Sequence, residues 1–557
     1  RPRAPRSPPH RFGAGSIAGM GPTTLSAALD AAATARPEAP FLRFEGASWS
    51  YGRFADRVRA VAGCLRAAGL APGERVALFL GNAPAWLTAH LGALWAGGTV
   101  VPVNARYRAA EVEHLLRDAD ARFLVTDAEH REEAARAVAL AALGTIVVDT
   151  GPGGADEAAA WSALADGDPI ASPTPADPAT PALIAYTSGT TGRSKGAVLT
   201  HAGLLANARA VARAWAWTDA DRLLLALPLF HVHGLAVGFH GTLVTGASAT
   251  LHRRFDPRAV LEGLRSGDAT LFFGVPTMYA RLLDATPGDR PTAPALRLFV
   301  SGSAPLPTTT LTRVEAAFGH RILERYGMTE TLMLTGNPLA GPRKPGGVGV
   351  PFEGVALRVG DRASGRPVEA GAVGEVLVRG PSVTPGYWND PEATHAAFTA
   401  DGFFRTGDLG YLDADGHLFL TGRSRELIIS GGFNVYPREV EDVIATVRGV
   451  REVAVLGLAD PDLGERVAAA VVRDDGPDDD AAFAQRVLEG CRERLAGFKV
   501  PRSLAFVPAL PRNAMGKVVR TALRDAFPND ATTAGSTRSR ADSGGMRGRS
   551  RHGDERS

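Results

Sequence analysis

The most informative segment of the chain reads Ile184-Ala-Tyr-Thr-Ser-Gly-Thr-Thr-Gly-Arg-Ser-Lys-Gly-Ala-Val-Leu-Thr-His201. Its apolar start is typical of a strand, and a loop of glycines and hydroxyl residues follows, with Lys195 near its end. Glycines let backbone N–H groups close around phosphate oxygens, hydroxyls donate further hydrogen bonds, and the lysine supplies charge. The loop lacks the Walker spacing, because Gly196 stands where that motif has serine or threonine. We predict a phosphate-binding loop, with an ordinary Ser/Gly turn as the alternative.

Helix-like and strand-like segments alternate on both sides of this loop. Residues 51–68 carry apolar side chains at helical spacing, residues 74–82 read as a short buried strand, and residues 83–96 read as a helix. The strand signature returns in segments 98–104, 122–127, 271–276 and 296–302. Buried apolar strands separated by helices predict parallel sheets with helices on both faces.

The alternation of helix-like and strand-like segments changes twice toward the C-terminus. From about residue 346 short strands and turns follow one another, and residues 410–423 look like a β-hairpin. After Arg423 a new unit of helix-like and strand-like segments begins, with no long linker before it. We predict an α/β fold in which residues 20–424 form a large N-terminal domain of parallel βα layers plus a small β-barrel-like subdomain. Residues 425–527 then form a small α+β C-terminal domain.

Composition narrows the class of protein. A chain of 557 residues exceeds the roughly 250–300 residues of a single core, and 45% hydrophobic with 22% charged residues is typical of globular proteins. No segment approaches the roughly 18 apolar residues needed to cross a bilayer. Two cysteines, Cys64 and Cys491, are too few for a disulfide framework or a four-ligand zinc site. We expect a soluble, cytoplasmic protein that does not bind membranes.

Both ends of the chain differ from its body. Residues 1–19 are rich in proline and hold four arginines and no acid, while residues 528–557 hold six arginines and four acids. The segment between them is therefore net acidic, which gives no reason to expect nucleic acid as a partner. We expect both ends to be disordered and Met20 to be the natural start.

Several motifs in a fixed order give the chain its resemblance to a known family. They are the loop above, Pro228-Leu-Phe-His-Val-His-Gly234, Ser301-Gly-Ser-Ala304, Glu324-Arg-Tyr-Gly-Met-Thr-Glu330, Phe404-Arg-Thr-Gly-Asp408, Gly422-Arg423, Ser430-Gly-Gly-Phe-Asn-Val-Tyr-Pro437 and Pro511-Arg-Asn-Ala-Met-Gly-Lys517. From about residue 22 to 527 the chain resembles the adenylate-forming superfamily of acyl-CoA synthetases, carrier-protein adenylation domains and luciferases. Such enzymes join a carboxylate to AMP and then pass the acyl group to a thiol.

The resemblance implies a site for ATP and Mg²⁺ that brings two anions together, a task that needs fixed positive charge and a metal. It implies that Glu330 and Thr190 hold the metal, that Asp408 accepts the ribose hydroxyls and that Tyr326 stacks near adenine. The full set of implied ATP- and AMP-binding residues is Thr187, Ser188, Gly189, Thr190, Thr191, Gly192, Lys195, Arg325, Tyr326, Gly327, Met328, Thr329, Asp408 and Arg423.

The resemblance also implies a moving C-terminal domain. Lys517 would enter the site during adenylation and bridge the substrate carboxylate and the α-phosphate; an exposed lysine is the alternative. The domain would then rotate about one hinge residue, which falls on Arg425, where relatives mostly carry lysine or aspartate. Gly431 and Gly432 would line the tunnel for the pantetheine arm of coenzyme A, although a simple turn explains them equally well.

The acid is expected to be malonate. Arg281 lies about one turn into a helix opened by Pro276, on the element that borders the acyl pocket in relatives, and it could pair with a second carboxylate; a surface position is the alternative. The motifs around it resemble those of malonyl-CoA synthetases. Ser303 would add a hydroxyl, and Val232 and Met328 would close a short pocket for malonate or methylmalonate. His231 is expected among the catalytic residues, where it shapes the pocket; a packing histidine is the alternative.

Other activities stay open. The acid could be oxalate, a cinnamate or a short-chain fatty acid, and the acceptor could be a carrier-protein thiol, although the chain carries no fused carrier domain. A nucleotide-binding relative without catalysis is a further possibility, against which the presence of Lys195, Glu330, Asp408 and Lys517 argues. The oligomeric state is not readable from the sequence.

Overall fold

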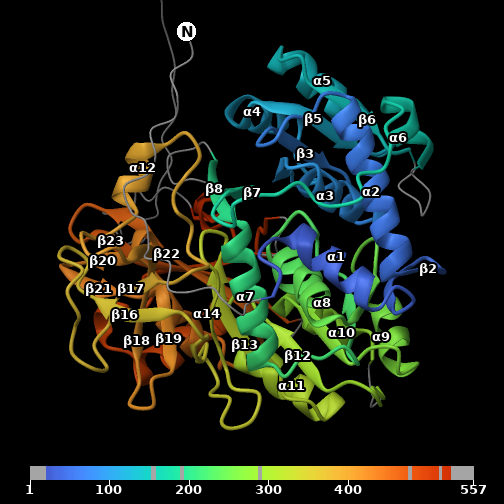
Figure 1. Ribbon diagram of the computed structural model, residues 1–557. Helices are drawn as coiled ribbons and strands as arrows, with labels where there is room; N and C mark the ends of the chain where they lie inside the picture. The colour runs from blue at the N-terminus through green and yellow to red at the C-terminus, as the bar shows by residue number, and fades with distance from the viewer. Residues whose placement is uncertain are drawn as a thin grey trace, which may run out of the picture.

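The computed structural model describes residues 21–151, 158–187, 194–286, 291–474, 479–513 and 517–527. The predicted disordered ends and the segment 188–193 of the phosphate loop lie outside these ranges. The chain begins with two layers of sheet and helices. Figure 1 shows α4, α5 and α6 of the first layer, in blue to teal, above α8 to α11 of the second layer, in green.

The first layer is a six-stranded sheet of order β6-β5-β3-β4-β7-β8. Its strands are β3 (Arg75–Phe79), β4 (Thr99–Pro102), β5 (Ala121–Thr126), β6 (Ile146–Asp149), β7 (Pro181–Thr187) and β8 (Lys195–Thr200). The associated helices are α2 (Tyr51–Ala67), α3 (Pro84–Trp95), α4 (Ala109–Ala119), α5 (Arg131–Ala141) and α6 (Ala158–Leu164). All pairs are parallel except β7 with β8, so the sheet confirms the predicted parallel βα layer.

Helix α3 shows why this layer is closely packed. Pro84 opens it at the first turn, and every residue of the helix is buried. At Gly92 an added Cβ would lie 2.5 Å from Cγ1 of Val61 on α2, so only glycine lets the two helices approach this closely. Helix α2 is in turn capped by Ser50, whose hydroxyl accepts a hydrogen bond from the Arg53 N–H.

The second layer is a nine-stranded sheet of order β15-β14-β13-β12-β11-β9-β10-β1-β2. Its strands are β1 (Pro40–Phe44), β2 (Ala47–Ser50), β9 (Arg222–Leu225), β10 (Ser248–Leu251), β11 (Leu271–Gly274), β12 (Leu298–Ser301), β13 (Leu323–Met328), β14 (Leu332–Gly336) and β15 (Val350–Pro351). Its helices are α1 (Leu25–Ala35), α7 (His201–Ala214), the π-helical η1 (His233–Phe239), α8 (His240–Thr245), α9 (Pro257–Arg265), α10 (Pro276–Asp284) and α11 (Thr308–Phe318). A continuous apolar core joins this layer to the first.

The predicted turn-rich region is an antiparallel sheet of four strands, and the last unit has a sheet of its own. The four strands are β16 (Ala356–Gly360), β17 (Gly374–Arg379), β18 (Phe404–Leu412) and β19 (Leu418–Arg423), accompanied by α12 (Pro391–Ala396). The last unit contains β20 (Ile428–Ser430), β21 (Phe433–Val435), β22 (Val450–Asp460), β23 (Gly464–Arg473), β24 (Ser503–Phe506), α13 (Pro437–Ile444) and α14 (Asp480–Arg494). The short 3₁₀ segments are η2 (Ser424–Glu426), η3 (Gly497–Lys499) and η4 (Arg520–Ala526).

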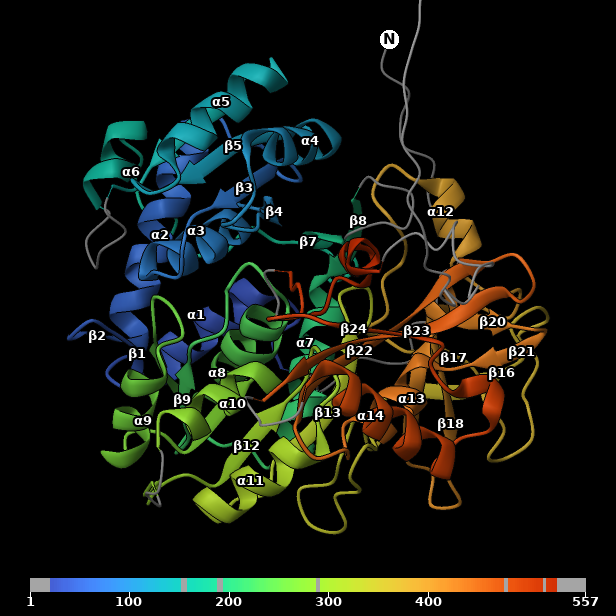
Figure 2. The ribbon, with the colours of Figure 1, turned by 180° about the vertical axis from the view of Figure 1, so that it is seen from behind.

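Apolar clusters cover both faces of the sheet in the last unit. One apolar cluster lies under α13 and α14, and a second includes Leu510, Leu523 and Phe527. Figure 2 shows β22 and β23, in orange to red, on the same side of the molecule as β16, β17 and β18. The predicted boundary after residue 424 falls within η2, which connects the two sheets. No described helix has the length and apolarity needed to span a bilayer.

Candidate active site

Asp408 is the best-anchored carboxylate of the predicted site. It lies on β18, 5% exposed, and its Oδ2 accepts a hydrogen bond of 2.5 Å from the Tyr326 phenol on β13. The antiparallel register of β18 and β19 places Arg423 directly opposite, with its Nε 3.1 Å from Oδ1 of Asp408. The carboxylate therefore stays oriented between a phenol and a guanidinium. Burial, together with Asp408, raises the pKa of Tyr326 well above its usual value, and the charge of Asp408 raises the pKa of Arg423.

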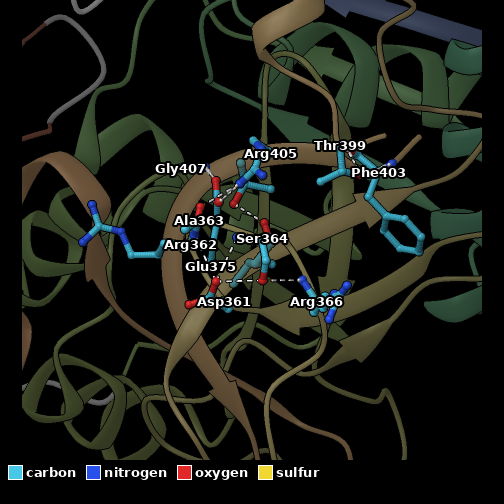
Figure 3. A network of polar contacts seen from close by, with 12 residues as sticks. Asp361, Arg362, Ala363, Ser364, Arg366, Glu375, Thr399, Phe403, Arg405 and Gly407 are labelled. Atoms are coloured by element: carbon cyan, nitrogen blue, oxygen red, sulfur yellow. Dashed lines mark hydrogen bonds and ion pairs between the residues drawn. The ribbon is translucent and has the colours of Figure 1, made fainter. Parts of the chain in front are cut away.

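The turn that leads into Asp408 is held by a second carboxylate, Glu375 on β17. Figure 3 shows Arg405 and Gly407 directed toward Glu375: the Arg405 guanidinium lies 2.6 Å from Oε2, and the Gly407 N–H donates to Oε1 at 3.3 Å. The hydroxyl of Thr406 accepts a hydrogen bond from the Asp408 N–H at 3.1 Å. These backbone and side-chain contacts along β18 fix where Asp408 points.

Glu330 connects the phosphate loop to the second layer. It sits 5% exposed in the turn between β13 and β14, and its Oε1 accepts hydrogen bonds at 3.2 Å from the Thr187 hydroxyl and from the Tyr387 phenol. Thr187 is the last residue of β7, directly before the loop, and is paired in register with Lys195 at the start of β8. The Lys195 ammonium lies 3.8 Å from the Asp390 carboxylate and over the Tyr387 ring.

Tyr387 and Asp390 were not foreseen from the sequence. Their signal was the run Pro385-Gly-Tyr-Trp-Asn-Asp390, which carries aromatic and acidic side chains in a turn-rich region but no recognised chemistry. The remaining loop residues assigned to phosphate binding lie outside the described ranges, namely Ser188, Gly189, Thr190, Thr191 and Gly192. Their role in binding ATP stays a prediction.

The carboxylate of Glu330 fits a magnesium ion that is bound chiefly through the phosphates of ATP. Both hydrogen bonds to Glu330 reach Oε1, and within the described residues Oε2 accepts none. Over the same ranges no group of three or more His, Cys, Asp or Glu side chains could hold a metal alone. Mg²⁺ commonly binds in this way, through one or two carboxylates together with substrate phosphates.

Lys517 reaches this site from the C-terminal unit. Its side chain is exposed, and its ammonium lies within electrostatic range of Arg423, Asp408 and Glu330. Desolvation, with the positive charge of Arg423, lowers the pKa of Lys517 to about 8, against the opposing influence of Asp408 and Glu330. Its backbone is held by Asn513, whose Oδ1 accepts from the Lys517 N–H at 3.0 Å and whose N–H donates to the Lys517 carbonyl at 2.9 Å. The structure thus brings this distant lysine near two predicted nucleotide-binding side chains, Asp408 and Arg423, and near Glu330, the predicted metal-holding carboxylate.

Two histidines form the opposite side of the site. His233 begins the π-helical segment η1, and its N–H donates to Nδ1 of His231 at 3.2 Å. Burial, together with the charges of Lys517 and Arg325, lowers the pKa of His231 to about 3, so this imidazole is neutral at physiological pH. The Ser303 hydroxyl lies 3.2 Å from Nδ1 of His233, which links two of the predicted motifs.

The residues expected to limit the pocket differ in burial. Val232 is 5% exposed, and Met328 is half-buried at the end of β13. Gly327 allows the tight return to β14, since an added Cβ would lie 2.0 Å from the Leu332 carbonyl oxygen. Thr329 is half-buried in the following turn.

Arg281 is exposed, and its role in binding a second carboxylate stays a prediction. Its side chain lies on the outer face of α10, whereas Tyr279, Leu282 and Leu283 of the same helix are buried. The Tyr279 phenol donates to the Val300 carbonyl at 2.7 Å. The helical period explains this difference, because residues two positions apart face nearly opposite sides. The buried arginine of this region is Arg325, which is 3% exposed and whose pKa is lowered to about 9 by burial.

The predicted hinge and tunnel residues lie in η2 and in the turn after β20. Arg425 is exposed. Gly431 and Gly432 have φ values of 58° and 83°, which favour glycine in the turn between β20 and β21. A Cβ at Gly432 would meet no atom within 4 Å, so the turn alone accounts for it in this arrangement. Their roles in rotation and in binding coenzyme A stay predictions.

Comparison with known proteins agrees with this geometry. The AMP-binding enzyme family matches residues 29–388, and the AMP-binding enzyme C-terminal domain matches residues 439–517. The chain is 37% identical over 506 residues to a sulfoacetate–CoA ligase of Cupriavidus necator, covering 90% of this chain and 97% of the relative. It is 34% identical over 483 residues to a malonate–CoA ligase of Arabidopsis thaliana, covering 82% and 78%.

A solved structure of a related enzyme supports the same family. The ATP-bound MatB of Rhodopseudomonas palustris superposes with a TM-score of 0.85 at 40% identity, covering 91% of this chain and 99% of that one. With its two matched domains, its anchored Asp408 and its inserted Lys517, the chain belongs to the adenylate-forming superfamily of acyl-CoA synthetases and is an AMP-forming acid–CoA ligase.

Proposed function

We propose that this enzyme is a malonate–CoA ligase. It would convert malonate, ATP and coenzyme A into malonyl-CoA, AMP and pyrophosphate, with methylmalonate as a second substrate. The observation that carries the proposal is that the Lys517 ammonium lies within electrostatic range of Arg423, Asp408 and Glu330 on the nucleotide side and of His231 on the acyl side. An ammonium at this place can meet both reacting anions.

In the first step, a carboxylate oxygen of the acid attacks the α-phosphorus of ATP. A new P–O bond forms, the bond to the β-phosphate breaks, and pyrophosphate leaves without a change in protonation. Lys517 would neutralise the attacking carboxylate and the α-phosphate, while Thr187 and Lys195 hold the leaving phosphates. Glu330 with Thr190 would hold Mg²⁺, which when bound supplies charge neutralisation on the triphosphate. Asp408 would accept the ribose hydroxyls.

In the second step, the thiol of coenzyme A attacks the carbonyl carbon of the adenylate. The C–S bond forms, the C–O bond to AMP breaks, AMP leaves with the bridging oxygen, and the thiol proton passes to solvent. Lys517 would have to leave before the thiol could enter. Rotation of the C-terminal unit about Arg425 would remove it and bring Gly431 and Gly432 to the site.

The choice of malonate rests on the acyl side of the site. We expect buried Val232 and half-buried Met328 to border the acyl pocket together with the neutral His231, and Ser303, whose hydroxyl contacts His233, to lie on the same side; such a pocket would favour a short acid over a long chain. Relatives support small acids with two anionic groups, because they include the malonate–CoA ligase and the sulfoacetate–CoA ligase above and an oxalate–CoA ligase of Arabidopsis thaliana.

A panel of acids tests the proposal. ATP–pyrophosphate exchange measures the first step alone, and formation of the thioester measures both steps. We expect malonate to give the highest kcat/KM among malonate, methylmalonate, oxalate, sulfoacetate, butyrate and ferulate. A higher value for any other acid would exclude malonate as the principal substrate and leave the ligase chemistry intact.

A second candidate is a ligase for a larger aromatic acid, because relatives also include a feruloyl-CoA synthase at 38% identity. The ferulate member of the panel tests it. Transfer to a carrier-protein thiol is tested by replacing coenzyme A with a phosphopantetheinylated carrier protein, which we expect to be acylated far more slowly than coenzyme A.

A further inference from the structure

We propose that Arg520 is a positioning residue for adenylate formation, because it ties the backbone next to Lys517 to η2, the segment that contains the predicted hinge Arg425. The inference rests on the proposed function in one respect, namely that Lys517 acts on the reacting anions during adenylation. Arg520 is assigned no contact with ATP or with the acid. It acts through the place that it gives to Lys517.

The backbone on the C-terminal side of Lys517 is short and paired. Lys517 exchanges two hydrogen bonds with Asn513, and Val518 forms an isolated β-bridge with Arg512. Arg520 follows after one further residue and begins η4. Whatever holds the side chain of Arg520 therefore also holds the paired backbone from which the Lys517 side chain extends.

The guanidinium of Arg520 contacts three elements of the C-terminal unit at once. Its Nη1 lies 3.0 Å from Oε2 of Glu426 in η2, and its Nη2 lies 2.6 Å from Oε1 of Glu441 on α13. Its Nε donates to the Val455 carbonyl on β22 at 3.0 Å. The donors of a guanidinium have a fixed planar arrangement, so three acceptors that satisfy them are also fixed relative to one another.

This contact is shielded from water and charged. The side chains of Arg520, Glu426 and Glu441 are 25%, 28% and 12% exposed. Burial acts to lower the pKa of Arg520, but Glu441 and Glu426 outweigh burial and raise it. Oε1 of Glu441 also accepts the Val455 N–H at 2.9 Å. Removing the guanidinium would leave two partly buried carboxylates without their cation, which favours a shift of the segments that carry them.

Glu426 connects this contact to the place where the C-terminal unit joins the rest of the chain. It directly follows Arg425, while Arg423, which pairs with Asp408, stands just before that hinge. One ion pair thus lies on each side of the hinge, and together they relate the predicted ribose carboxylate to the backbone of the catalytic lysine. A displacement of about 1 Å at a reacting group can lower a rate by about 100-fold, so this relation should matter for adenylation.

The inference predicts a loss that is confined to the first half-reaction. Glu426 and Arg520 both follow Arg425 in the chain, so their contact would move with the C-terminal unit when that unit rotates. The rotation would carry Lys517 away before the thiol enters. The exact position of Lys517 should then have no effect on thioester formation.

The experiment measures both half-reactions in R520M, which removes the guanidinium and keeps an apolar chain. We expect kcat of ATP–pyrophosphate exchange to fall by about 100-fold, with KM values for ATP and for the acid within about twofold of wild type. Thioester formation from supplied acyl-adenylate should stay close to the wild-type rate. The acid is the one that gives the fastest exchange in the panel, so the outcome does not depend on malonate. Unchanged exchange in folded R520M, or equal losses in both half-reactions, would overturn the inference.

A double variant tests whether Arg520 acts through Lys517. Two residues that act through one group have effects that do not add. In the K517A background, R520M should therefore change the residual rate of exchange by less than about threefold. A further loss in K517A/R520M as large as the loss in R520M alone would show that Arg520 acts independently of the lysine, which overturns the inference.

Two conservative variants decide the matter if R520M does not fold. R520K keeps the positive charge without the planar set of donors, so it should fall between R520M and wild type in exchange. E426Q keeps the shape of Glu426 and removes its charge, and it should lower exchange while sparing thioester formation. Wild-type exchange in both R520K and E426Q would overturn the inference.

R473M is the matched control within the same unit. The side chain of Arg473 is 26% exposed, and its Nη1 lies 2.9 Å from the Asp480 carboxylate, so it resembles Arg520 in burial and in having an acidic partner. The ion pair connects β23 to α14 and does not involve η2. We expect R473M to keep both half-reactions. A loss of exchange equal to that in R520M would show a general effect on the C-terminal unit and would exclude a specific role for Arg520.

The single variant K517A separates this inference from the proposed function. If K517A keeps the wild-type rate of exchange, the assignment of Lys517 is wrong, and positioning by Arg520 is excluded with it. If K517A loses exchange and R520M does not, the role of Lys517 stands and only the role of Arg520 is excluded.

Discussion

The Tyr326 phenol donates a hydrogen bond of 2.5 Å to the Asp408 carboxylate across 82 residues of sequence. The bond connects β13 of the second layer to β18 of the antiparallel sheet, and Asp408 also faces Arg423 on β19. Three motifs that are far apart in the chain therefore share one carboxylate. This arrangement orients the group expected to bind the ribose before any nucleotide arrives.

Replacing Tyr326 by phenylalanine should weaken nucleotide binding. The change removes a donor to a buried carboxylate, and hydrogen bonds to charged groups contribute about 1.5–3 kcal/mol. We expect the KM for ATP to rise by about tenfold or more with a smaller change in kcat, measured by ATP–pyrophosphate exchange. Y411F, on β18 with Asp408, is the control, since the Tyr411 ring stacks on Phe419. Equal KM values for Y326F and wild type would contradict this role.

Replacing Lys517 by alanine should separate the two half-reactions. Loss of a donor to a transition state costs about 10²–10³ in rate, so adenylate formation should fall by at least this factor. Thioester formation from chemically prepared malonyl-adenylate should stay close to the wild-type rate, because the lysine must leave before the thiol enters. K344A is the control, because Lys344 pairs with Asp413 and Asp415. Equal losses in both half-reactions would exclude this role.

The first half-reaction should lose rate in alkaline solution. The folded pKa of Lys517 is lowered to about 8, so its charged form prevails below pH 8 and disappears as the pH rises through that value. Since the cation is the active form, the rate of adenylation should be level below about pH 7.5 and decline above pH 8. Thioester formation from supplied adenylate, measured over the same range, should lack this decline. A pH profile of adenylation that stays level to pH 9.5 would contradict the assignment.

The contact between α2 and α3 predicts a change in stability. In G92A the added methyl group would overlap Val61, and overpacking of this kind costs about 1–3 kcal/mol. We expect the Tm, measured by calorimetry, to fall in G92A and to recover in part in the double variant V61A/G92A. G144A, where an added Cβ meets no atom within 4 Å, should keep the wild-type Tm. A Tm for G92A at or above the wild-type value would show that the helices separate without cost.

Much of the fold was predictable because its signals are local. The apolar segments at 74–82 and 271–276 became β3 and β11, and residues 51–68 became α2, since period and burial act over a few residues at a time. The hairpin expected at 410–423 is the β18–β19 pair. The family was predictable for the same reason, because its motifs are short and continuous.

The acyl side of the site was less predictable because it depends on which way each side chain points. From the sequence, Arg281 was assigned to the substrate carboxylate and Arg325 to the nucleotide. One side chain is exposed on a helix, whereas the other is buried on a strand against Gly302. Which of two arginines turns inward depends on how α10 and β13 pack, and composition carries no information about that.

By itself, the order of residues determined the α/β class, the family and the identity of the ligase's charged groups, because each of these depends on short runs of neighbouring residues. Only the tertiary structure decided that Tyr326 and Arg423 meet at Asp408 and that Lys517 lies near Glu330. Such relationships arise where strands of different sheets approach one another, and the distance between two side chains in space is set by packing of the whole chain and not by their separation along it.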